Sequence, residues 1–118
     1  MSNNELLVLT KKLIERNQSA LQSFNKVRET GKQGDFYLEV KPFADQVKRE
    51  CEEWLPLAIE WVNRIKPKHL HSVQLENTCE NLQMVSVRAF FPDSSLKKFK
   101  SHVQSVDYVL NRMLGEIS

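Results

Sequence analysis

Apolar residues recur every three or four positions in four separate segments of the chain, the spacing that lines one face of an α-helix. These segments span residues 4–30, 42–66, 72–91 and 96–114. The second carries an unbroken seam made of Ala44, Val47, Cys51, Trp54, Ala58, Trp61 and Ile65. The links after the second and third segments are short, which favours antiparallel neighbours. The pattern therefore predicts an all-α protein, an antiparallel up-down-up-down four-helix bundle.

Local signals at the segment ends support these boundaries. The expected N-caps are Ser2 or Asn3 for the first helix and Ser94 or Ser95 for the fourth. The expected stop signals are Gly31, Gly34, Pro67, Pro92 and Gly115. Pro56 lies inside the second segment, where the seam keeps its phase, so we expect a kink at this residue. The irregular crossover at residues 31–41 has room for one extra helical turn.

Size and composition agree with one helical domain over residues 1–118. The chain has 41% hydrophobic and 27% charged residues, with only three Gly and four Pro. A net charge of +2 gives no support to binding of nucleic acid through phosphate neutralisation. We find no signal peptide and no apolar run long enough for a membrane span. Two Cys without CxxC spacing indicate a reducing compartment, so we expect a soluble cytoplasmic protein.

All the phenylalanines fall at one end of the predicted bundle, together with Tyr37. They are Phe24, Phe36, Phe43, Phe90, Phe91 and Phe99. One interpretation is a buried plug, closed by the crossover between the first two helices. The other is that part of the cluster stays exposed as a docking patch, in which Phe36, Tyr37, Phe43 and Phe91 would contact a partner.

The predicted bundle geometry argues against several kinds of chemistry. His102 lies far along the axis from His69 and His71, so a tri-histidine metal centre is excluded, and no Glu-x-x-His motif is present. Cys51 and Cys79 are expected on the order of 15 Å apart along the axis, too far for a disulfide. No nucleophile–base arrangement or phosphate loop is visible. We therefore expect no cofactor, no metal site and no catalytic residue.

Two polar features remain. Asn17 interrupts the apolar stripe of the first helix, about level with Trp54, whose indole N–H needs a partner when buried. It is predicted to be a buried polar residue that fixes helix register. The other feature is a basic cluster that opposes the dipole of the fourth helix and is either a solvated face or a site for an anionic partner. It comprises Lys97, Lys98, Lys100 and His102.

Several short fragments, in a fixed order, are similar to the pattern of one known family. In the first half they are Asp35-Phe36-Tyr37, Val40-Lys41-Pro42-Phe43 and the pair Trp54 and Trp61. In the second half they are Pro67-Lys68 with His71 and Gln74, Glu80-Asn81, Phe90-Phe91-Pro92, Lys98-Phe99, and Ser105-Val106 with Tyr108 and Leu110. The chain thus resembles, over nearly its whole length, the YppE-like family of small bacterial helical-bundle proteins, whose biochemical function has not been established.

The resemblance implies a four-helix bundle and supplies no catalytic residue. It departs at residues 93–95, where the family pattern is more basic, so it does not by itself imply an anion-binding role. It nominates a polar set with a functional role or a capping role, made of His71, Gln74, Glu80 and Asn81.

Three functional hypotheses follow. The first is a non-catalytic protein that binds another protein, as a monomer or homodimer, with no membrane and no nucleic acid involved. The second is a small-molecule- or metal-dependent bundle enzyme with a core pocket near Asn17, Trp54 and Glu80. The third is a weak nucleic-acid binder that uses the turn from Lys97 to Lys100.

Overall fold

The computed structural model describes residues 3–117, which form four α-helices and one short π-helical turn. The elements in chain order are α1 (Asn4–Thr30), η1 (Phe36–Val40), α2 (Lys41–Ile65), α3 (Ser72–Arg88) and α4 (Leu96–Ile117). The prediction of an all-α four-helix bundle is confirmed. The extra helical turn expected in the crossover is η1.

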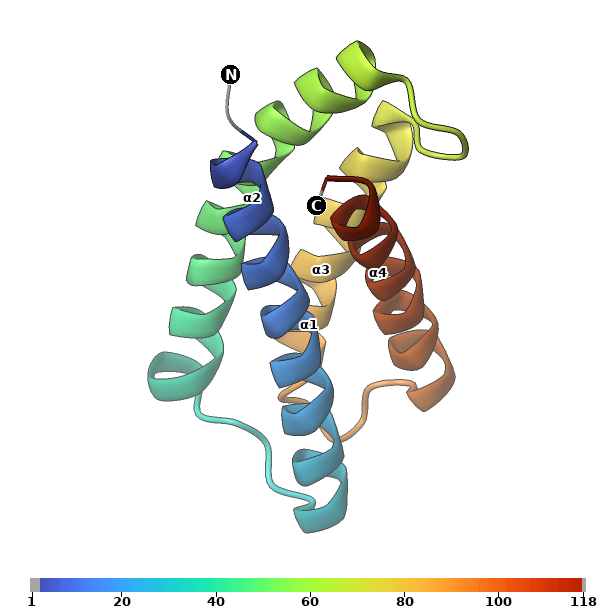
Figure 1. Ribbon diagram of the computed structural model, residues 1–118. Coiled ribbons are helices and arrows are strands. Elements are labelled where there is room, and N and C mark those ends of the chain that lie inside the picture. The colour runs from blue at the N-terminus through green and yellow to red at the C-terminus, as the bar shows by residue number, and fades with distance from the viewer. Residues whose placement is uncertain (1–2, 118) are drawn as a thin grey trace.

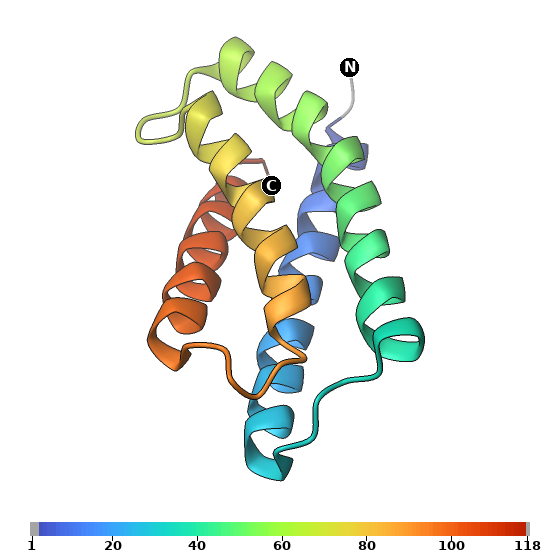
Figure 2. The ribbon, with the colours of Figure 1, turned by 180° about the vertical axis from the view of Figure 1, so that it is seen from behind.

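Consecutive helices run in opposite directions, so that α1 descends, α2 ascends, α3 descends and α4 ascends (Figure 1). The link between α2 and α3 lies at the end of the bundle where the chain starts and finishes, and the other two links lie at the opposite end (Figures 1 and 2). Each helix packs against its chain neighbour, and α1 also packs against α4 and α3. No helix within residues 3–117 has the length and apolar character needed to cross a bilayer.

The core follows the predicted stripes. A larger cluster of buried residues contains both Trp54 and Trp61, and a smaller one surrounds Phe24 and Phe99 near the crossover. In α4, buried apolar residues recur every three or four positions, at Phe99, Val103, Val106, Leu110 and Met113. At the side, a half-buried ion pair joins α1 to α2, where Arg16 meets Glu50 through two hydrogen bonds of 2.9 Å.

Several helix ends differ from the prediction. Helix α3 ends at Arg88, three residues early, because the Arg88 carbonyl accepts hydrogen bonds from the Phe91 N–H and the Ser94 hydroxyl. Helix α4 continues through Gly115, which an α-helix tolerates at a cost of about 1 kcal/mol. Ser95 caps α4 by accepting from the Lys98 N–H. Asn3 occupies the N-cap position of α1 without a side-chain cap bond, and Ser2 lies outside the described residues.

Helix α2 is unbroken at Pro56, as the continuous seam predicted. Beyond this point the helix leans across the end of the bundle, above the start of α3 (Figure 1). This path changes the register between α2 and α3. The Cys79 Sγ lies 3.9 Å from the Cys51 carbonyl oxygen, so the predicted separation of about 15 Å is wrong. Counting residues along two straight helices could not account for a bent helix.

The two buried cysteines are unpaired and lie side by side. A hydrogen bond to Cys51, together with burial, raises the pKa of the Cys79 thiol. The folded state therefore keeps this proton after the unfolded chain has lost its own near pH 8.5. Stability from this thiol is complete below that pH and falls as the pH rises above it.

We expect the free energy of unfolding to fall between pH 8.5 and 9.5 by about 1 kcal/mol more in the native chain than in a Cys79→Ala variant. Urea denaturation of both proteins at a series of pH values measures this difference. Parallel pH profiles would contradict the shift.

The buried polar groups pair differently from the prediction. Asn17 is only 1% exposed, but its Nδ2 donates to the Val103 carbonyl at 3.0 Å and not toward Trp54. The Trp54 Nε1–H donates instead to the Thr10 hydroxyl at 3.0 Å. Thr10 in turn donates to the Leu6 carbonyl at 2.7 Å, so one hydroxyl joins the indole to the α1 backbone. Asn17 therefore ties α1 to α4, and Thr10 ties α1 to α2.

Candidate functional site

The crossover between α1 and α2 carries three consecutive large apolar side chains at the surface. Phe36, Tyr37 and Leu38 are 54%, 76% and 80% exposed. The rings of Phe36 and Tyr37 meet edge to face, with centroids 5.1 Å apart. We call these three residues the crossover surface. Isolated apolar side chains at a surface are normal, but a contiguous set indicates a site of interaction.

Backbone hydrogen bonds hold this surface in one conformation. The Asp35 Oδ1 accepts from the N–H groups of Tyr37 and Leu38 at 3.0 and 2.9 Å, which caps the π-helical turn. Glu39 reaches back to accept from the Asp35 N–H at 2.7 Å. Val40, at the end of the turn, is buried in the smaller core cluster. The exposed side chains are thus presented on a preorganised turn, and π-helical turns are frequent at functional sites.

Gly34 anchors the crossover to the end of α3. Its N–H donates to the Phe90 carbonyl at 2.9 Å. A Cβ at position 34 would lie 2.8 Å from the Phe90 Cδ1 and 2.9 Å from the Phe90 Cβ. Because the Phe90 Cβ is attached directly to the backbone, it cannot move aside, and only glycine allows this close approach.

We expect Gly34→Ala to lower the free energy of unfolding by about 1–2 kcal/mol, since either the crossover or Phe90 must shift. Urea denaturation measures the loss. Gly115→Ala is the matched control, because a Cβ there meets no atom within 4 Å and Ala favours the helix. Equal destabilisation by the two substitutions would contradict the steric argument.

The aromatic end is partly core and partly surface. The rings of Phe24 and Phe99 stack with centroids 3.9 Å apart, and Phe43 meets Phe90 edge to face at 5.9 Å. Phe43 is half-buried against both core clusters, so it contributes more to core packing than to a surface that a partner could contact. Phe91 is also half-buried. Of the candidate partner-binding aromatics, Phe36 and Tyr37 are therefore the exposed pair, and Leu38 joins them although its sequence context did not nominate it.

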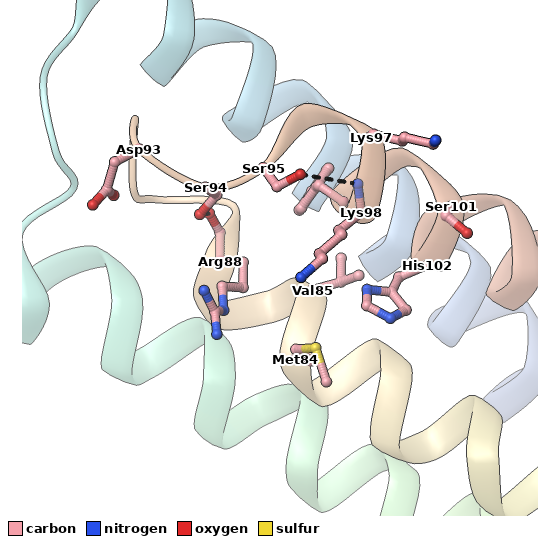
Figure 3. A pocket seen from close by; sticks show the side chains of 11 residues that line it. Met84, Val85, Arg88, Asp93, Ser94, Ser95, Lys97, Lys98, Ser101 and His102 are labelled. Atoms are coloured by element: carbon pink, nitrogen blue, oxygen red, sulfur yellow. Dashed lines mark hydrogen bonds between the residues drawn. The ribbon is translucent and has the colours of Figure 1, made fainter.

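A groove of about 860 Å³ lies between the last turns of α3 and the first turns of α4. Its floor is formed by the apolar side chains of Met84, Val85 and Phe99. Arg88, Lys98 and His102 line its walls, and the Lys98 side chain reaches across above Met84 (Figure 3). We call this cavity the α3–α4 groove.

The predicted basic cluster divides at this groove. Lys97 and Lys98 both belong to its lining, but the Lys98 side chain crosses it toward Arg88, whereas the Lys97 side chain extends outward (Figure 3). Lys100 is exposed and does not line the groove. Sequence reasoning missed Arg88 and Met84, because both belong to α3 and their pairing with α4 depends on how the two helices meet.

The polar set nominated by the resemblance, His71, Gln74, Glu80 and Asn81, does not meet at a single site. The Gln74 Oε1 accepts from the His71 N–H at 2.7 Å, so these two residues cap α3. Glu80 is exposed. Asn81 lies with Gln74 and Tyr108 along a second, polar groove of about 480 Å³ between α3 and α4.

Asn17, Trp54 and Glu80, proposed to surround a core pocket, line neither of the two grooves between α3 and α4. Asn17 and Trp54 are buried in different core contacts, and Glu80 lies at the surface. The Asn17 Oδ1 accepts no hydrogen bond, but neither Asn17 nor Trp54 lines any of the grooves described above. Within residues 3–117, no group of three or more His, Cys, Asp or Glu side chains could hold a metal ion.

These elements define a helical-bundle protein with an ordered apolar turn and a basic groove. The chain belongs to a bacterial family described as a domain of unknown function, DUF1798, whose profile matches residues 10–117. The predicted resemblance to the YppE-like proteins is confirmed, because the uncharacterised protein YppE of Bacillus subtilis is 24% identical over 118 residues, covering 100% of this chain and 96% of that one.

Solved structures agree with this assignment. A protein of unknown function from Listeria innocua is 39% identical, with a TM-score of 0.93 over 98% of this chain and 92% of that one. A DUF1798 protein from Staphylococcus aureus is 26% identical, with a TM-score of 0.89 over 98% and 97%. The crystal structure of YppE has a TM-score of 0.92 over 99% and 95%. These relatives share the fold, and their descriptions give no function.

Proposed function

We propose that this chain is a non-catalytic protein of the bacterial cytoplasm that works by binding another protein through the crossover surface. The observation that carries the proposal is the exposure of Phe36, Tyr37 and Leu38 on a turn held by side-chain and backbone hydrogen bonds. A disordered loop would lose conformational entropy on binding, and this ordered turn avoids most of that cost.

The chemistry of the surface suggests the kind of partner. Tyr and Phe are the side chains that bury large apolar area with few rotatable bonds, which is why aromatic residues dominate interface energetics. Leu38 extends the apolar area beyond the two rings. The partner should therefore present a concave apolar pocket. Two unpaired buried cysteines are in keeping with a reducing compartment such as the cytoplasm.

The enzyme hypothesis has less support. Glu80 is exposed whereas Asn17 and Trp54 are buried, and the Trp54 N–H is already satisfied by Thr10. For the nucleic-acid hypothesis, the Lys97 and Lys98 side chains extend in different directions (Figure 3), and Lys100 does not line the groove that they share, so these residues give little support to a continuous basic track.

Affinity capture from bacterial lysate tests the proposal when the bait is compared with two single variants. Tyr37→Ala removes the most exposed ring of the crossover surface. Tyr108→Ala removes the other exposed tyrosine, which belongs to α4, and is the matched control. We expect a partner that is retained by Tyr108→Ala and weakened at least about 30-fold by Tyr37→Ala, the effect of losing an interface hot spot of about 2 kcal/mol.

Both tyrosines are exposed, so neither variant should change the thermal unfolding midpoint, and this measurement excludes misfolding as the cause. Equal capture by all three baits would contradict the role of the crossover surface. Binding reduced only by Tyr108→Ala would show that the interface lies on α4 and not on the crossover surface.

A further inference from the structure

The α3–α4 groove has a chemistry that neither the core nor the crossover explains. Elsewhere, four cationic side chains are matched by carboxylates, in the pairs Arg16–Glu50, Lys41–Asp45, Arg64–Glu60 and Arg112–Glu116. Within residues 3–117, no hydrogen bond or ion pair engages the side chains of Arg88, Lys98 or His102, although all three line this one groove. The carboxylate of Asp93, which also lines the groove, extends away from them (Figure 3).

The location adds to the local excess of positive charge. Lys98 and His102 lie in the first turns of α4, where the helix dipole already favours an anion. Cations placed there repel that end of the helix, at a cost of a few tenths of a kcal/mol each. An anion seated between Arg88 and Lys98 would reverse this penalty, because it would contact both side chains and lie near the positive end of α4.

The floor of the groove is apolar and adaptable. Met84 is exposed, and its flexible thioether can follow the shape of what it contacts. Val85 and Phe99 are buried beneath and hold the floor in place, Phe99 through its stack on Phe24. A groove of about 860 Å³ lies within the range of about 300–1,000 Å³ typical of small-molecule sites. A cationic wall beside an apolar floor is complementary to a ligand that has both an anionic group and an apolar group.

We infer that the α3–α4 groove binds a small organic phosphate, with the phosphoryl group between Arg88 and Lys98 and the apolar part of the ligand on Met84. A phosphate monoester carries a charge of about −1.5 to −2 at neutral pH, which matches the two permanent cations. Arg can bind a phosphoryl group through two parallel hydrogen bonds, and Lys adds a point charge. His102 and the Ser101 hydroxyl lie further along the groove, within the same lining.

The site goes beyond the proposed protein-binding role and does not depend on it, since the crossover surface is built from other residues. Phenyl phosphate is a suitable probe, because it has one phosphoryl group and one apolar ring. Inorganic phosphate is the reference ligand, because its affinity measures the contribution of the phosphoryl group without an apolar ring. Titrations followed by amide chemical shifts, at about 0.15 M salt to screen distant charges, give both the affinity and the location.

Adjacent lysines provide a matched pair of variants. Lys98→Glu and Lys97→Glu cause the same change in net charge at neighbouring exposed positions that both line the groove, but only the Lys98 side chain crosses it toward Arg88 (Figure 3). We expect Lys98→Glu to weaken phenyl phosphate binding about tenfold or more and Lys97→Glu to weaken it by about twofold or less. Met84→Gln should weaken phenyl phosphate about threefold and leave inorganic phosphate unchanged, because only the ring uses the floor.

Several results would overturn the inference. Equal weakening by the two lysine variants would show that binding depends on the net charge of the protein and not on the position of Lys98. Equal affinities for phenyl phosphate and inorganic phosphate would remove the role of the apolar floor, and the absence of shifts near Met84 and Lys98 at millimolar probe would remove the site. Tighter binding of a single-stranded oligonucleotide, weakened alike by both lysine variants, would assign the cluster to nucleic acid instead.

Discussion

Phe24→Ala is expected to lower the free energy of unfolding by about 3–5 kcal/mol, the cost of removing a fully buried aromatic side chain. Phe24 has no exposed surface, and its ring stacks on that of Phe99 with an interplanar angle of 8°. The guanidinium of Arg28, a residue of the same helix, lies 5.5 Å from the centroid of the Phe24 ring. The substitution therefore removes the centre of the smaller core cluster, where α1 meets α4.

Urea denaturation followed by circular dichroism measures this loss. Phe36→Ala is the matched control: it deletes the same side chain from the crossover surface, where Phe36 contacts solvent and the ring of Tyr37. We expect this control to cost less than about 1 kcal/mol. A double variant with Phe99→Ala should lose less than the sum of the two single losses, by about 0.5–1.5 kcal/mol for the stacked pair. Similar losses for Phe24 and Phe36 would contradict the division of the aromatic end into core and surface.

Thr10→Val is expected to lower the free energy of unfolding by about 1–3 kcal/mol, although valine has nearly the shape of threonine. Thr10 and Trp54 both have no exposed surface, and the Thr10 hydroxyl is the hydrogen-bond partner of the indole N–H. Valine leaves that N–H buried without an acceptor. The cost is the desolvation of an unsatisfied donor rather than a change in packing.

Thr78→Val is the control for this prediction. Thr78 is also buried, but its hydroxyl donates only to the Gln74 carbonyl in its own helix, at 2.8 Å. Since no other side chain depends on it, we expect a change within about 0.5 kcal/mol. Tryptophan fluorescence during urea denaturation reports both variants. An equal effect of the two substitutions would show that the Trp54 hydrogen bond contributes nothing of its own.

The sequence predicted the helices well where periodicity and end signals agreed. Helix α1 begins and ends at the predicted residues, and Gly31 accepts the left-handed conformation that ends it. The prediction failed where local signals were weaker than tertiary contacts. Gly115 did not end α4, and α3 ended at Arg88, whose carbonyl accepts hydrogen bonds from the Phe91 N–H and the Ser94 hydroxyl.

The candidate surfaces were only half predictable. Phe36, Tyr37 and Lys98 were nominated from their residue types and positions, but their exposure and direction were not. The α3–α4 groove joins Met84 and Arg88 of one helix to Lys98 and His102 of the next. No pattern within either segment indicates that pairing, because it depends on the rotation and height of two helices relative to each other.

The sequence by itself determined the all-α class and which face of each helix is buried, because helical periodicity is local and each apolar stripe has to leave water. The tertiary structure alone decided which residues meet across helices. The bend of α2 beyond Pro56 brought Cys79 next to Cys51. The packing of the helices determined that Trp54 forms a hydrogen bond with Thr10 and that Asn17 forms one with Val103. These contacts depend on the path of the links and the tilt of each helix, and a one-dimensional pattern does not specify either.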